Sequence, residues 1–371
     1  MTTASQLARN EDERLLADSI GRFGATANEF ETRRQRLAGP APDRMALWAD
    51  LAELGVQGVS VPEAAGGLGG GPGALGVVME ALGAALVVEP VLAVVMSARL
   101  LEHATDGLAL VAGLVAGTEV PVIAHQEGAD PFAPPRLAAR RGPDGWCLDG
   151  AKPAVRHGDV ATIFLVSARG EDGAAMLFSV PRDAAGLTVA PLRLIDGAGA
   201  ADLVFAAVPA EPLAPRDGAA VALADALDWG LSALAAETAG IIAQANRITF
   251  EYLAVRKQFG TTLASFQALR HRAADMAMAG EEAAAMAARA IAALDDPPSP
   301  ARSRIVLSAS LACDEAGRLV GHDAVQLHGG MGVSDELVVS HYARRLAAIR
   351  HQIGAPDIRR ARLATLIGAC M

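Results

Sequence analysis

The chain has 371 residues, a formal charge of −10, 52% hydrophobic residues and only 4% aromatic ones. This length suits two or three packed domains, and the dominance of Ala and Leu favours helix over strand. No block of consecutive Lys or Arg stands out, so the sequence carries no electrostatic footprint for nucleic acid. The three cysteines are far apart and lack metal-ligand spacing, which predicts a reduced intracellular protein without a metal site.

The first residues are polar and acidic, so we do not expect them to be a secretory signal. The apolar run over residues 82–98 is interrupted by Glu89 and Pro90, so it falls short of the ~18 uncharged residues of a membrane span. We therefore expect a cytoplasmic protein that does not enter a membrane.

Residues 1–118 show a helical pattern. Apolar residues recur at helical spacing over 11–23, and Asp43 is a candidate cap for a helix that ends at Gly55. Further helices are predicted over 73–101 and 106–117. The Gly-rich loop at 66–71 lacks the preceding strand of a dinucleotide fingerprint, so it is predicted to be a turn.

Residues 119–213 change to short strands separated by Asp, Gly and Pro. The predicted strands cover residues 120–125, 137–141, 146–148, 161–168, 174–180, 187–192 and 201–208. The second and third flank Gly-Pro-Asp-Gly, which is a good hairpin turn. The pattern predicts a compact antiparallel barrel or sandwich.

Residues 214–371 return to helix. Long Ala- and Leu-rich segments cover 219–255, 265–294 and 300–320, and a shorter pair follows Gly330. Helices of this kind usually form a four-helix bundle. The predicted fold is α+β but mainly α, with an N-terminal helical domain (1–118), a central small β-barrel (119–213) and a C-terminal helical bundle (214–371).

Two C-terminal segments carry motifs. In residues 252–276 a helix ends in a cationic turn at Arg256, Gly260 lets the chain reverse, and Ser265 can cap a new helix. In residues 324–333 three glycines follow an amphipathic helix, and their backbone N–H groups can approach an anion such as a phosphate closely.

These two segments, the loop at residues 61–69 and the α, β, α order together resemble the acyl-CoA dehydrogenase family over nearly the whole chain. The resemblance implies a flavoprotein oxidoreductase that acts on an acyl-CoA thioester. It further implies FAD as cofactor and an electron-transfer flavoprotein as electron acceptor.

The resemblance also implies roles for particular residues. The predicted contacts to the FAD of a neighbouring subunit are Arg256, Gln258, Phe259 and Gln267, and those along its pyrophosphate or ribityl chain are Gln326, Gly329 and Gly330. An Arg offers a fixed fork of donors to a phosphate, and the glycines offer bare backbone donors. One FAD held by two chains implies an oligomer.

A narrower resemblance is to the small subunit of pimeloyl-CoA dehydrogenase. The stretches that carry it are residues 155–159, 166–169, 196–201 and 252–276. That type pairs two different subunits and handles CoA thioesters of dicarboxylic acids. It therefore favours an α₂β₂ heterotetramer with a paralogous chain over a homotetramer.

The catalytic base of the family is usually a Glu, at one of two places. In this chain those places hold Ile353 and Gly230, neither of which can accept a proton. Glu237, two helical turns beyond Gly230, is a weak candidate for the base. The alternative is a structural Glu paired with an Arg of a neighbouring helix, since a buried carboxylate needs a partner.

The β domain departs from the family as well. His125-Gln126-Glu127 stands where Thr-Glu-Pro is usual, and Ala154 stands where a Trp usually covers the flavin ring. Arg156 or His157 could stabilise the anionic reduced flavin, because a nearby cation lowers the energy of an anion. The alternative is a solvated basic loop.

The sequence leads to one main hypothesis and two alternatives. The main one is a subunit that helps to desaturate an acyl-CoA, possibly a dicarboxylyl-CoA, together with a paralogue that supplies the missing Glu. The alternatives are a non-catalytic stabilising partner and a flavin monooxygenase of the same fold, which needs no α-proton base. The acyl chain itself is not predicted.

Overall fold

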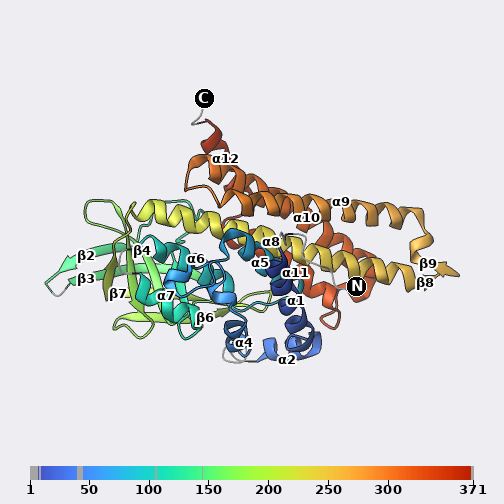
Figure 1. Cartoon of the computed structure of the whole chain (residues 1–371), viewed down its shortest axis with the longest axis horizontal. Helices are drawn as coiled ribbons and strands as arrows, with labels where there is room; N and C mark the ends of the chain where they lie inside the picture. The colour runs from blue at the N-terminus through green and yellow to red at the C-terminus, as the bar shows by residue number, and fades with distance from the viewer. Residues whose placement is uncertain (1–6, 8–9, 40–44, 105–106, 144, 369–371) are drawn as a thin grey trace. The chain divides into compact units, whose positions relative to one another are not determined.

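The computed structural model describes residues 7, 10–39, 45–104, 107–143 and 145–368 (Figure 1). The chain divides into two compact units. The first contains Met1–Arg33, Pro72–Val87 and Leu231–Met371, and the second contains Arg34–Gly71 and Val88–Gly230.

The first unit is helical. Its helices are α1 (Glu11–Thr26), α5 (Gly71–Ala84), most of α8 (Ala219–Val255), α9 (Gln267–Ala293), α10 (Pro300–His328), α11 (Val338–Gln352) and α12 (Pro356–Gly368). Helix α1 begins with a capping box in which the Asn10 and Glu13 side chains each accept the backbone N–H of the other. Helix α10 begins at Pro300 behind Ser299, whose hydroxyl accepts the N–H of Arg302.

Helix α10 is the centre of the bundle, because it contacts α9, α11 and α12. Alanines repeat along the buried face of α9 at positions 279, 283, 287 and 290. Their small side chains allow α9 and α10 to lie side by side along most of their length (Figure 1). The pairing brings the start of α9 and the end of α10 to the same end of the bundle.

Helices α5 and α8 pack even more closely, through two glycines. A Cβ at Gly83 would overlap the carbonyl oxygen of Glu237, and a Cβ at Gly240 would overlap that of Glu80. Each glycine therefore lets one helix backbone rest on the other. Any larger residue at these positions would force the two helices apart.

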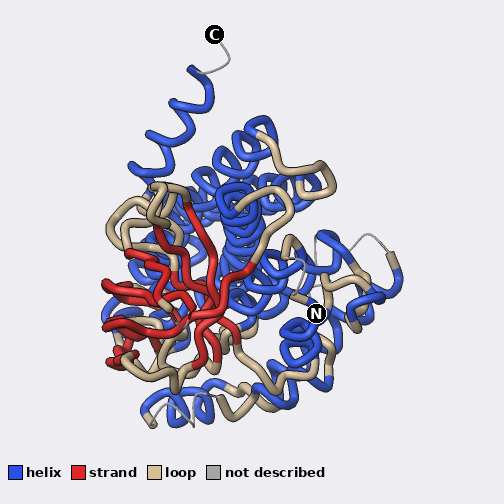
Figure 2. Tube along the Cα trace, turned by 90° about the vertical axis from the view of Figure 1, so that its left-hand side faces the viewer, coloured by secondary structure: helices blue, strands red, loops and turns tan. Residues whose placement is uncertain are grey.

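The second unit contains the β structure, which Figure 2 shows as one group of strands. The strands are β1 (Pro121–Ala124), β2 (Ala138–Gly142), β3 (Gly145–Arg156), β4 (Ile163–Arg169), β5 (Ala175–Pro181), β6 (Leu187–Arg193) and β7 (Gly199–Leu213). The sheet closes on itself, since β4 pairs with both β2 and β5, and β7 pairs with both β3 and β5. Strand β4 is part of the barrel wall and pairs with β1, β2 and β5, and its Phe164, Leu165 and Val166 are fully buried.

Helices and turns of the second unit flank the barrel strands in sequence. They are α4 (Trp48–Glu53), η1 (Val56–Gly58), η2 (Glu63–Ala65), α6 (Val91–Glu102) and α7 (Leu108–Val115), and α2 (Phe30–Ala38) begins in the first unit. Trp48 is buried, and its indole N–H donates to the carbonyl of Gly117 at 2.9 Å. This bond ties α4 to the end of α7.

The predicted fold class is confirmed: helices, a barrel-like sheet and helices follow one another along the chain. The helix predicted over 219–255 matches α8 residue for residue, and the predicted hairpin is β2–β3. The predicted cap Asp43 and the predicted helix start at 106 lie outside the described residues. The bounds of the three domains stay a prediction.

Three expectations were wrong in detail. The sheet is mixed rather than antiparallel, because β1 and β2 each pair with β4 in parallel. Helix α2 was not predicted, and α10 runs on to His328 instead of ending near residue 320. The parallel pairs join segments that are distant in sequence, so no local turn pattern marks them.

Helix α8 is also long and apolar enough to cross a membrane by length and composition alone. Its most apolar 18-residue window is 78% buried within the structure, and the core helix of a soluble protein passes the same test. The length of α8 is thus weak evidence for a membrane segment.

Candidate functional site

The two motif-bearing segments lie next to each other in the first unit. The ring of Tyr252, near the end of α8, stacks on the ring of His328, the last residue of α10, with centroids 4.4 Å apart and planes 24° apart. Arg272 of α9 adds an ion pair with Asp323 of α10 at 3.1 Å. The structure therefore brings together the two segments that the sequence analysis singled out.

A short hairpin forms the tip between α8 and α9. Its strands are β8 (Lys257–Gln258) and β9 (Thr261–Thr262), and the backbone N–H of Leu263 donates to the carbonyl of Arg256 at 2.8 Å. Phe259 sits at the turn with a φ of 53° and is 91% exposed. A positive φ is unusual for a residue with a side chain, so the turn holds Phe259 out at some energetic cost.

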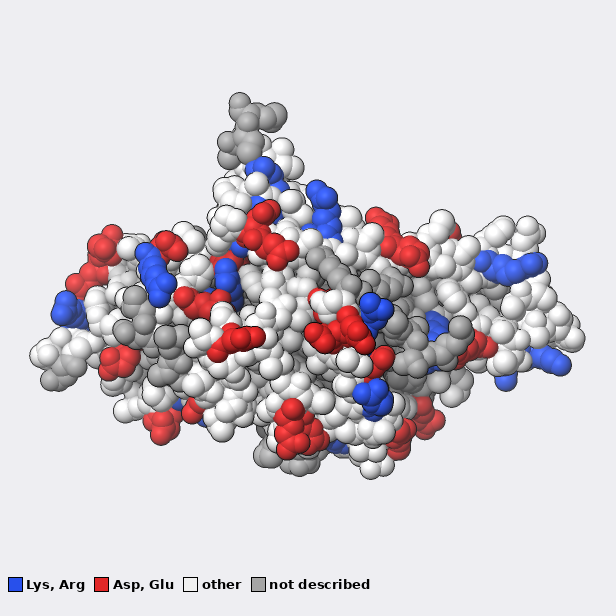
Figure 3. Space-filling view, in the orientation of Figure 1, with Lys and Arg blue, Asp and Glu red and all other residues white. Residues whose placement is uncertain are grey.

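The predicted cofactor contacts at this tip all reach solvent. Arg256, Gln258, Gln267 and Gln326 are exposed, and no side-chain partner engages the Arg256 guanidinium among the described residues. Lys and Arg side chains gather at this end of the visible face in Figure 3. The basic residues of the tip are Arg256, Lys257, Arg270 and Arg272. The tip is thus an open, positively charged surface with an exposed aromatic ring.

The glycine turn after α10 is open as well. Gly329 has a φ of 65°, and a Cβ built on Gly329 or Gly330 would meet nothing within 4 Å. Gly332 differs, because a Cβ there would overlap the carbonyl of Val325. The first two glycines therefore leave their backbone accessible to a ligand, and the third is needed for the turn to pack on α10.

The two usual positions of the catalytic base hold no ionisable group. Ile353 caps the end of α11, is 5% exposed and is followed by Gly354 with a φ of 74°. Gly230 is buried within α8. An apolar side chain and a missing one cannot take up a proton.

Glu237 is held by a buried ion pair. Arg345 of α11 donates from Nε to Oε1 of Glu237 at 2.6 Å and from Nη2 to Oε2 at 2.7 Å. The side chains are 6% and 3% exposed. This bidentate pair corresponds to the structural alternative named above, since both carboxylate oxygens already accept from the guanidinium. The geometry favours a structural role for Glu237, as the partner of Arg345, over the role of a catalytic base.

Arg156 and His157 end strand β3 in buried surroundings. Arg156 donates to the buried Asp196 at 2.7 Å, and His157 is 5% exposed with a φ of 60°. The alternative of a solvated basic loop is therefore wrong for these two side chains. A role of Arg156 beside a flavin stays a prediction.

A buried polar network lies where the family usually has Thr-Glu-Pro. The Lys152 ammonium, fully buried, donates to Glu127 at 2.6 Å, to the carbonyl of His125 at 2.9 Å and to the Ser167 hydroxyl at 3.2 Å. The ring of His125 contacts Ser167 through Nδ1 at 2.7 Å and the carbonyl of Pro131 through Nε2 at 3.0 Å. A carbonyl only accepts, so Nε2 carries the proton and Nδ1 accepts from Ser167.

Burial sets the protonation of this network. It lowers the pKa of His125 to about 4, with the Lys152 charge adding to the effect, and it lowers the pKa of Lys152 to about 8 against the pull of Glu127. Burial alone would raise the pKa of Glu127, but the bonds from Lys152, Leu137 and Arg136 outweigh it and lower that pKa. The burial of Lys152 could not be predicted, because nothing in the local sequence marks a lysine in a strand as buried.

Comparison with known proteins identifies the family. The model of the acyl-CoA dehydrogenase N-terminal domain matches residues 10–107, and that of the C-terminal domain matches residues 216–367. The chain therefore belongs to the acyl-CoA dehydrogenase family, which carries out flavin-dependent oxidation of acyl-CoA thioesters. It is an oxidoreductase of that class.

Particular relatives show how far the similarity extends. The probable acyl-CoA dehydrogenase FadE25 of Mycobacterium tuberculosis is 29% identical over 84% of each chain. The solved Tcur3481-Tcur3483 steroid ACAD variant is 33% identical, with a TM-score of 0.86 over 97% of this chain and 98% of that one. A glutaryl-CoA dehydrogenase from Mycobacterium smegmatis in complex with FADH2 is 19% identical, with a TM-score of 0.86 over 99% and 97%, and shares the fold.

Proposed function

We propose that this chain is a subunit of an FAD-dependent acyl-CoA dehydrogenase that introduces a double bond between Cα and Cβ of a CoA thioester, and that a paralogous chain supplies the catalytic Glu. One observation carries the proposal. Neither usual base position is ionisable, and the nearby Glu237 has both oxygens bound by Arg345. A chain with this arrangement needs a base from elsewhere to remove the α-proton.

The exposed tip supports FAD as the cofactor. An exposed guanidinium at Arg256 and the open backbone of Gly329 and Gly330 suit a pyrophosphate, and the exposed ring of Phe259 offers a face for stacking. Residues that would share the contacts are Gln258, Gln267 and Gln326. When bound, the flavin takes up the hydride that leaves Cβ. This chain's part is to bind and orient the cofactor.

Exposed apolar side chains at the same end support an assembly of subunits. Val255, Phe259, Met331 and Val333 are 74%, 91%, 54% and 75% exposed. Large apolar side chains that cluster at a surface usually meet another chain. We propose an α₂β₂ heterotetramer with a paralogous subunit, in which electrons pass on to an electron-transfer flavoprotein. The similar steroid ACAD is named after two proteins, Tcur3481 and Tcur3483, which supports such a pairing.

Co-expression with a paralogous acyl-CoA dehydrogenase tests the proposal. Flavin absorbance, subunit stoichiometry and turnover with a panel of CoA thioesters would be measured on the purified complex. We expect a tetramer with half its flavin sites filled and turnover that disappears when the paralogue's Glu is replaced by Gln. Full turnover by this chain alone, without the paralogue, would refute the proposed division of labour.

A pair of matched variants tests the cofactor contacts. Arg256→Met removes the exposed guanidinium of the tip, and Arg318→Met removes an exposed guanidinium on α10 that pairs only with Glu315 among the described residues. We expect the purified Arg256→Met complex to lose most of its flavin and the Arg318→Met complex to keep it. Equal flavin content in both would remove Arg256 from the site.

A second candidate is a stabilising partner that binds no flavin. It is favoured by the two buried ion pairs, Glu237 with Arg345 and Arg156 with Asp196, which occupy the charges that a working site would use. A chain that is colourless when purified alone and adds no flavin to that of its paralogue, with equal turnover of the complex when Arg256 is replaced by Met, would favour this candidate. A flavin-containing complex that responds to Arg256→Met would exclude it.

A further inference from the structure

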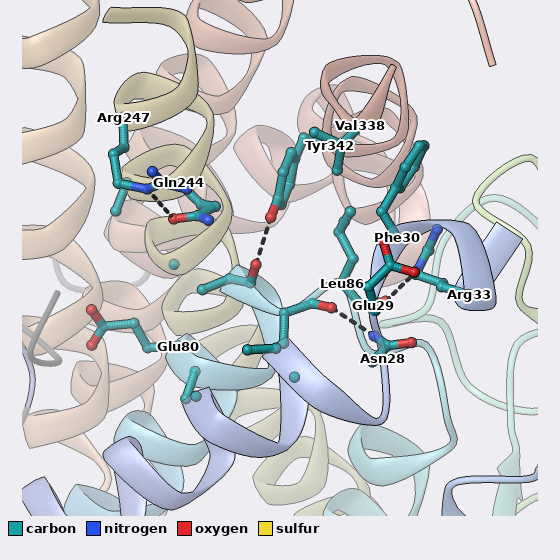
Figure 4. A pocket seen from close by; sticks show the side chains of 18 of the residues that line it. Asn28, Glu29, Phe30, Arg33, Glu80, Leu86, Gln244, Arg247, Val338 and Tyr342 are labelled. Carbon is teal, nitrogen blue, oxygen red and sulfur yellow. Dashed lines mark hydrogen bonds between the residues drawn. The ribbon is translucent and has the colours of Figure 1, made fainter. Parts of the chain in front are cut away.

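A cavity of about 520 Å³ lies wholly within the first unit, around the end of α5 (Figure 4). Five helices line it, namely α1, the start of α2, α5, α8 and α11, together with the turn before α2. None of its lining residues is among the predicted FAD contacts. Its size falls within the range of about 300–1,000 Å³ typical of small-molecule sites.

The wall at the end of α5 is fixed by three side chains from three different places. The Tyr342 hydroxyl donates to the carbonyl of Ala84 at 2.6 Å, the Asn28 amide to that of Ala85 at 2.7 Å, and Arg33 Nε to that of Leu86 at 2.8 Å (Figure 4). Ala84 is the last residue of α5, and Ala85 and Leu86 follow it. Carbonyls at the end of a helix have no partner within the helix, so these bonds satisfy three successive carbonyls where α5 ends. The wall is therefore formed before any ligand arrives, which reduces the ordering that binding requires.

Glycines and alanines form most of the cavity wall away from the end of α5, and their small side chains leave that wall flat. The lining glycines and alanines are Ala17, Gly21, Gly24, Ala25, Ala81, Ala84, Ala85, Gly240 and Ala243. They come from three helices, so the cavity has broad apolar faces instead of side-chain ridges. Phe30 and Tyr342 add two aromatic rings (Figure 4). Such faces suit a flat apolar molecule.

One end of the cavity offers a fixed hydrogen-bond donor. Arg247 Nε donates to Gln244 at 3.0 Å and Nη1 donates to Glu251 at 2.8 Å, so the plane of the guanidinium is held. Its Nη2 engages no group among the described residues. A planar donor held in place by two other bonds binds an acceptor oxygen with little loss of freedom.

The charges around the cavity nearly balance. Its lining contains three acidic residues, Asp18, Glu29 and Glu80, and two basic ones, Arg33 and Arg247. The Glu80 carboxylate accepts the backbone N–H of Leu7 at 3.2 Å, and that of Glu29 accepts the N–H of Glu31 at 3.0 Å. A cavity with this balance does not attract an ion of either sign strongly. The ligand should therefore be neutral.

We propose that this cavity binds a neutral, flat, mainly apolar molecule of about three or four fused rings, with an acceptor oxygen placed at Arg247. The binding does not depend on the cofactor or on the desaturation reaction. The site can therefore be tested without turnover, and its failure leaves the proposed function untouched.

Two substitutions at Gly21 test the site. Gly21 lines the cavity, and a Cβ there would meet nothing within 4 Å, so a side chain can begin at this position without displacing its neighbours. Gly21→Phe fills the space, whereas Gly21→Ala adds one carbon, and both remove a glycine from the interior of α1. The fluorescent probe 1-aminoanthracene would be titrated into the full-length protein as isolated, with circular dichroism to confirm the fold.

We expect the wild-type and Gly21→Ala proteins to bind the probe within about threefold of each other, and Gly21→Phe to bind at least about tenfold more weakly. Equal binding by all three proteins, or no saturable binding by the wild type, would overturn the proposal. If Gly21→Phe fails to fold, Ala243→Phe fills the cavity from α8 and serves as the second test.

The polar end is tested with a matched pair of competitors, fluorenone and fluorene, which differ by one carbonyl oxygen. In the Arg247→Met protein we expect fluorenone to displace the probe about tenfold less well than in the wild type, with fluorene unchanged. Arg247→Lys should restore part of the difference. A loss that is equal for both competitors would contradict the placement of the acceptor oxygen at Arg247.

Discussion

The tip of the α8–α9 connection and the interior around Glu237 use the same kinds of side chain in opposite ways. At the tip, Arg256 and Phe259 are exposed, and no side-chain partner holds the guanidinium within the described part of the chain. In the interior, Arg345 and Glu237 are buried and bound to each other by two bonds. The difference separates charges that can meet a ligand from charges that hold helices together.

The contrast bears directly on function. An exposed guanidinium loses little solvation free energy until a ligand or a partner chain covers it, whereas a buried pair must be satisfied within the fold. The chain thus has at its tip an exposed guanidinium that is unpaired among the described residues, as a cofactor contact would require, and no carboxylate at the usual base positions. Both halves of the proposed function follow from that contrast.

The largest expected effect comes from breaking the buried pair. Arg345→Ala leaves the Glu237 carboxylate buried without its partner, and we expect a loss of about 3–5 kcal/mol in the free energy of unfolding, measured with urea. Arg344→Ala is the control, because Arg344 is 38% exposed and pairs with the exposed Asp335 at 2.6 Å. It should change stability by less than about 1 kcal/mol. Equal effects of the two variants would show that Glu237 does not need Arg345.

The next effect is a dependence of stability on pH at the buried network of the β domain. Burial lowers the pKa of His125 from 6.5 to about 4, so below pH 6.5 the unfolded chain binds a proton there that the folded chain does not. The contribution of the neutral, buried His125 to the free energy of unfolding is fully present above pH 6.5. It is lost as the pH falls towards 4, and the loss is roughly 3 kcal/mol. Unfolding curves of the wild-type and His125→Gln proteins at pH 7.5 and 4.5 would measure it. A wild-type loss no larger than that of the variant would contradict the expectation.

A smaller effect is expected at the end of α5. Tyr342→Phe removes the hydroxyl that donates to the carbonyl of Ala84, and we expect a loss of about 1 kcal/mol. Tyr252→Phe is the matched control, since the Tyr252 hydroxyl makes no hydrogen bond with any described residue, and it should change little. Burial raises the pKa of Tyr342 well above that of a free tyrosine, so the bond should persist at alkaline pH. If both variants are equally stable, the hydrogen bond from Tyr342 to the carbonyl of Ala84 contributes nothing to the free energy of unfolding.

The smallest effect on stability is expected at the tip. Arg256→Met removes a side chain that is exposed and unpaired among the described residues, so the free energy of unfolding should change by less than about 0.5 kcal/mol. Thermal melting of the chain without added flavin would measure it. A loss of more than about 1 kcal/mol would mean that Arg256 serves the fold, and the contrast between tip and interior would fail there.

Much of the fold could be predicted because its signals are local. Helix α8 appears in the sequence as an Ala- and Leu-rich run, and Gly142, Pro143 and Gly145 mark the β2–β3 hairpin. The parallel pairing of β1 with β4 could not be predicted, because it joins residues about forty positions apart through no turn of their own. Local propensity describes elements but not their partners.

The candidate site shows the same limit. The glycines and Arg256 could be selected from the sequence, and an Arg partner for Glu237 was named as an alternative. Which Arg forms this pair could not be predicted, because Arg345 lies 108 residues further along the chain than Glu237. Lys152 was missed entirely, since its burial depends on Glu127 and Ser167 arriving from two other segments.

The central claim is that the exposed tip of this chain binds FAD, and the affinity for FAD tests it most directly. Quenching of flavin fluorescence would be titrated with the complex of this chain and its paralogue, carrying either wild-type Arg256 or Arg256→Met. The account predicts at least a tenfold weaker affinity for the variant, with the assembly and melting temperature unchanged. Equal affinity in the two complexes would contradict it.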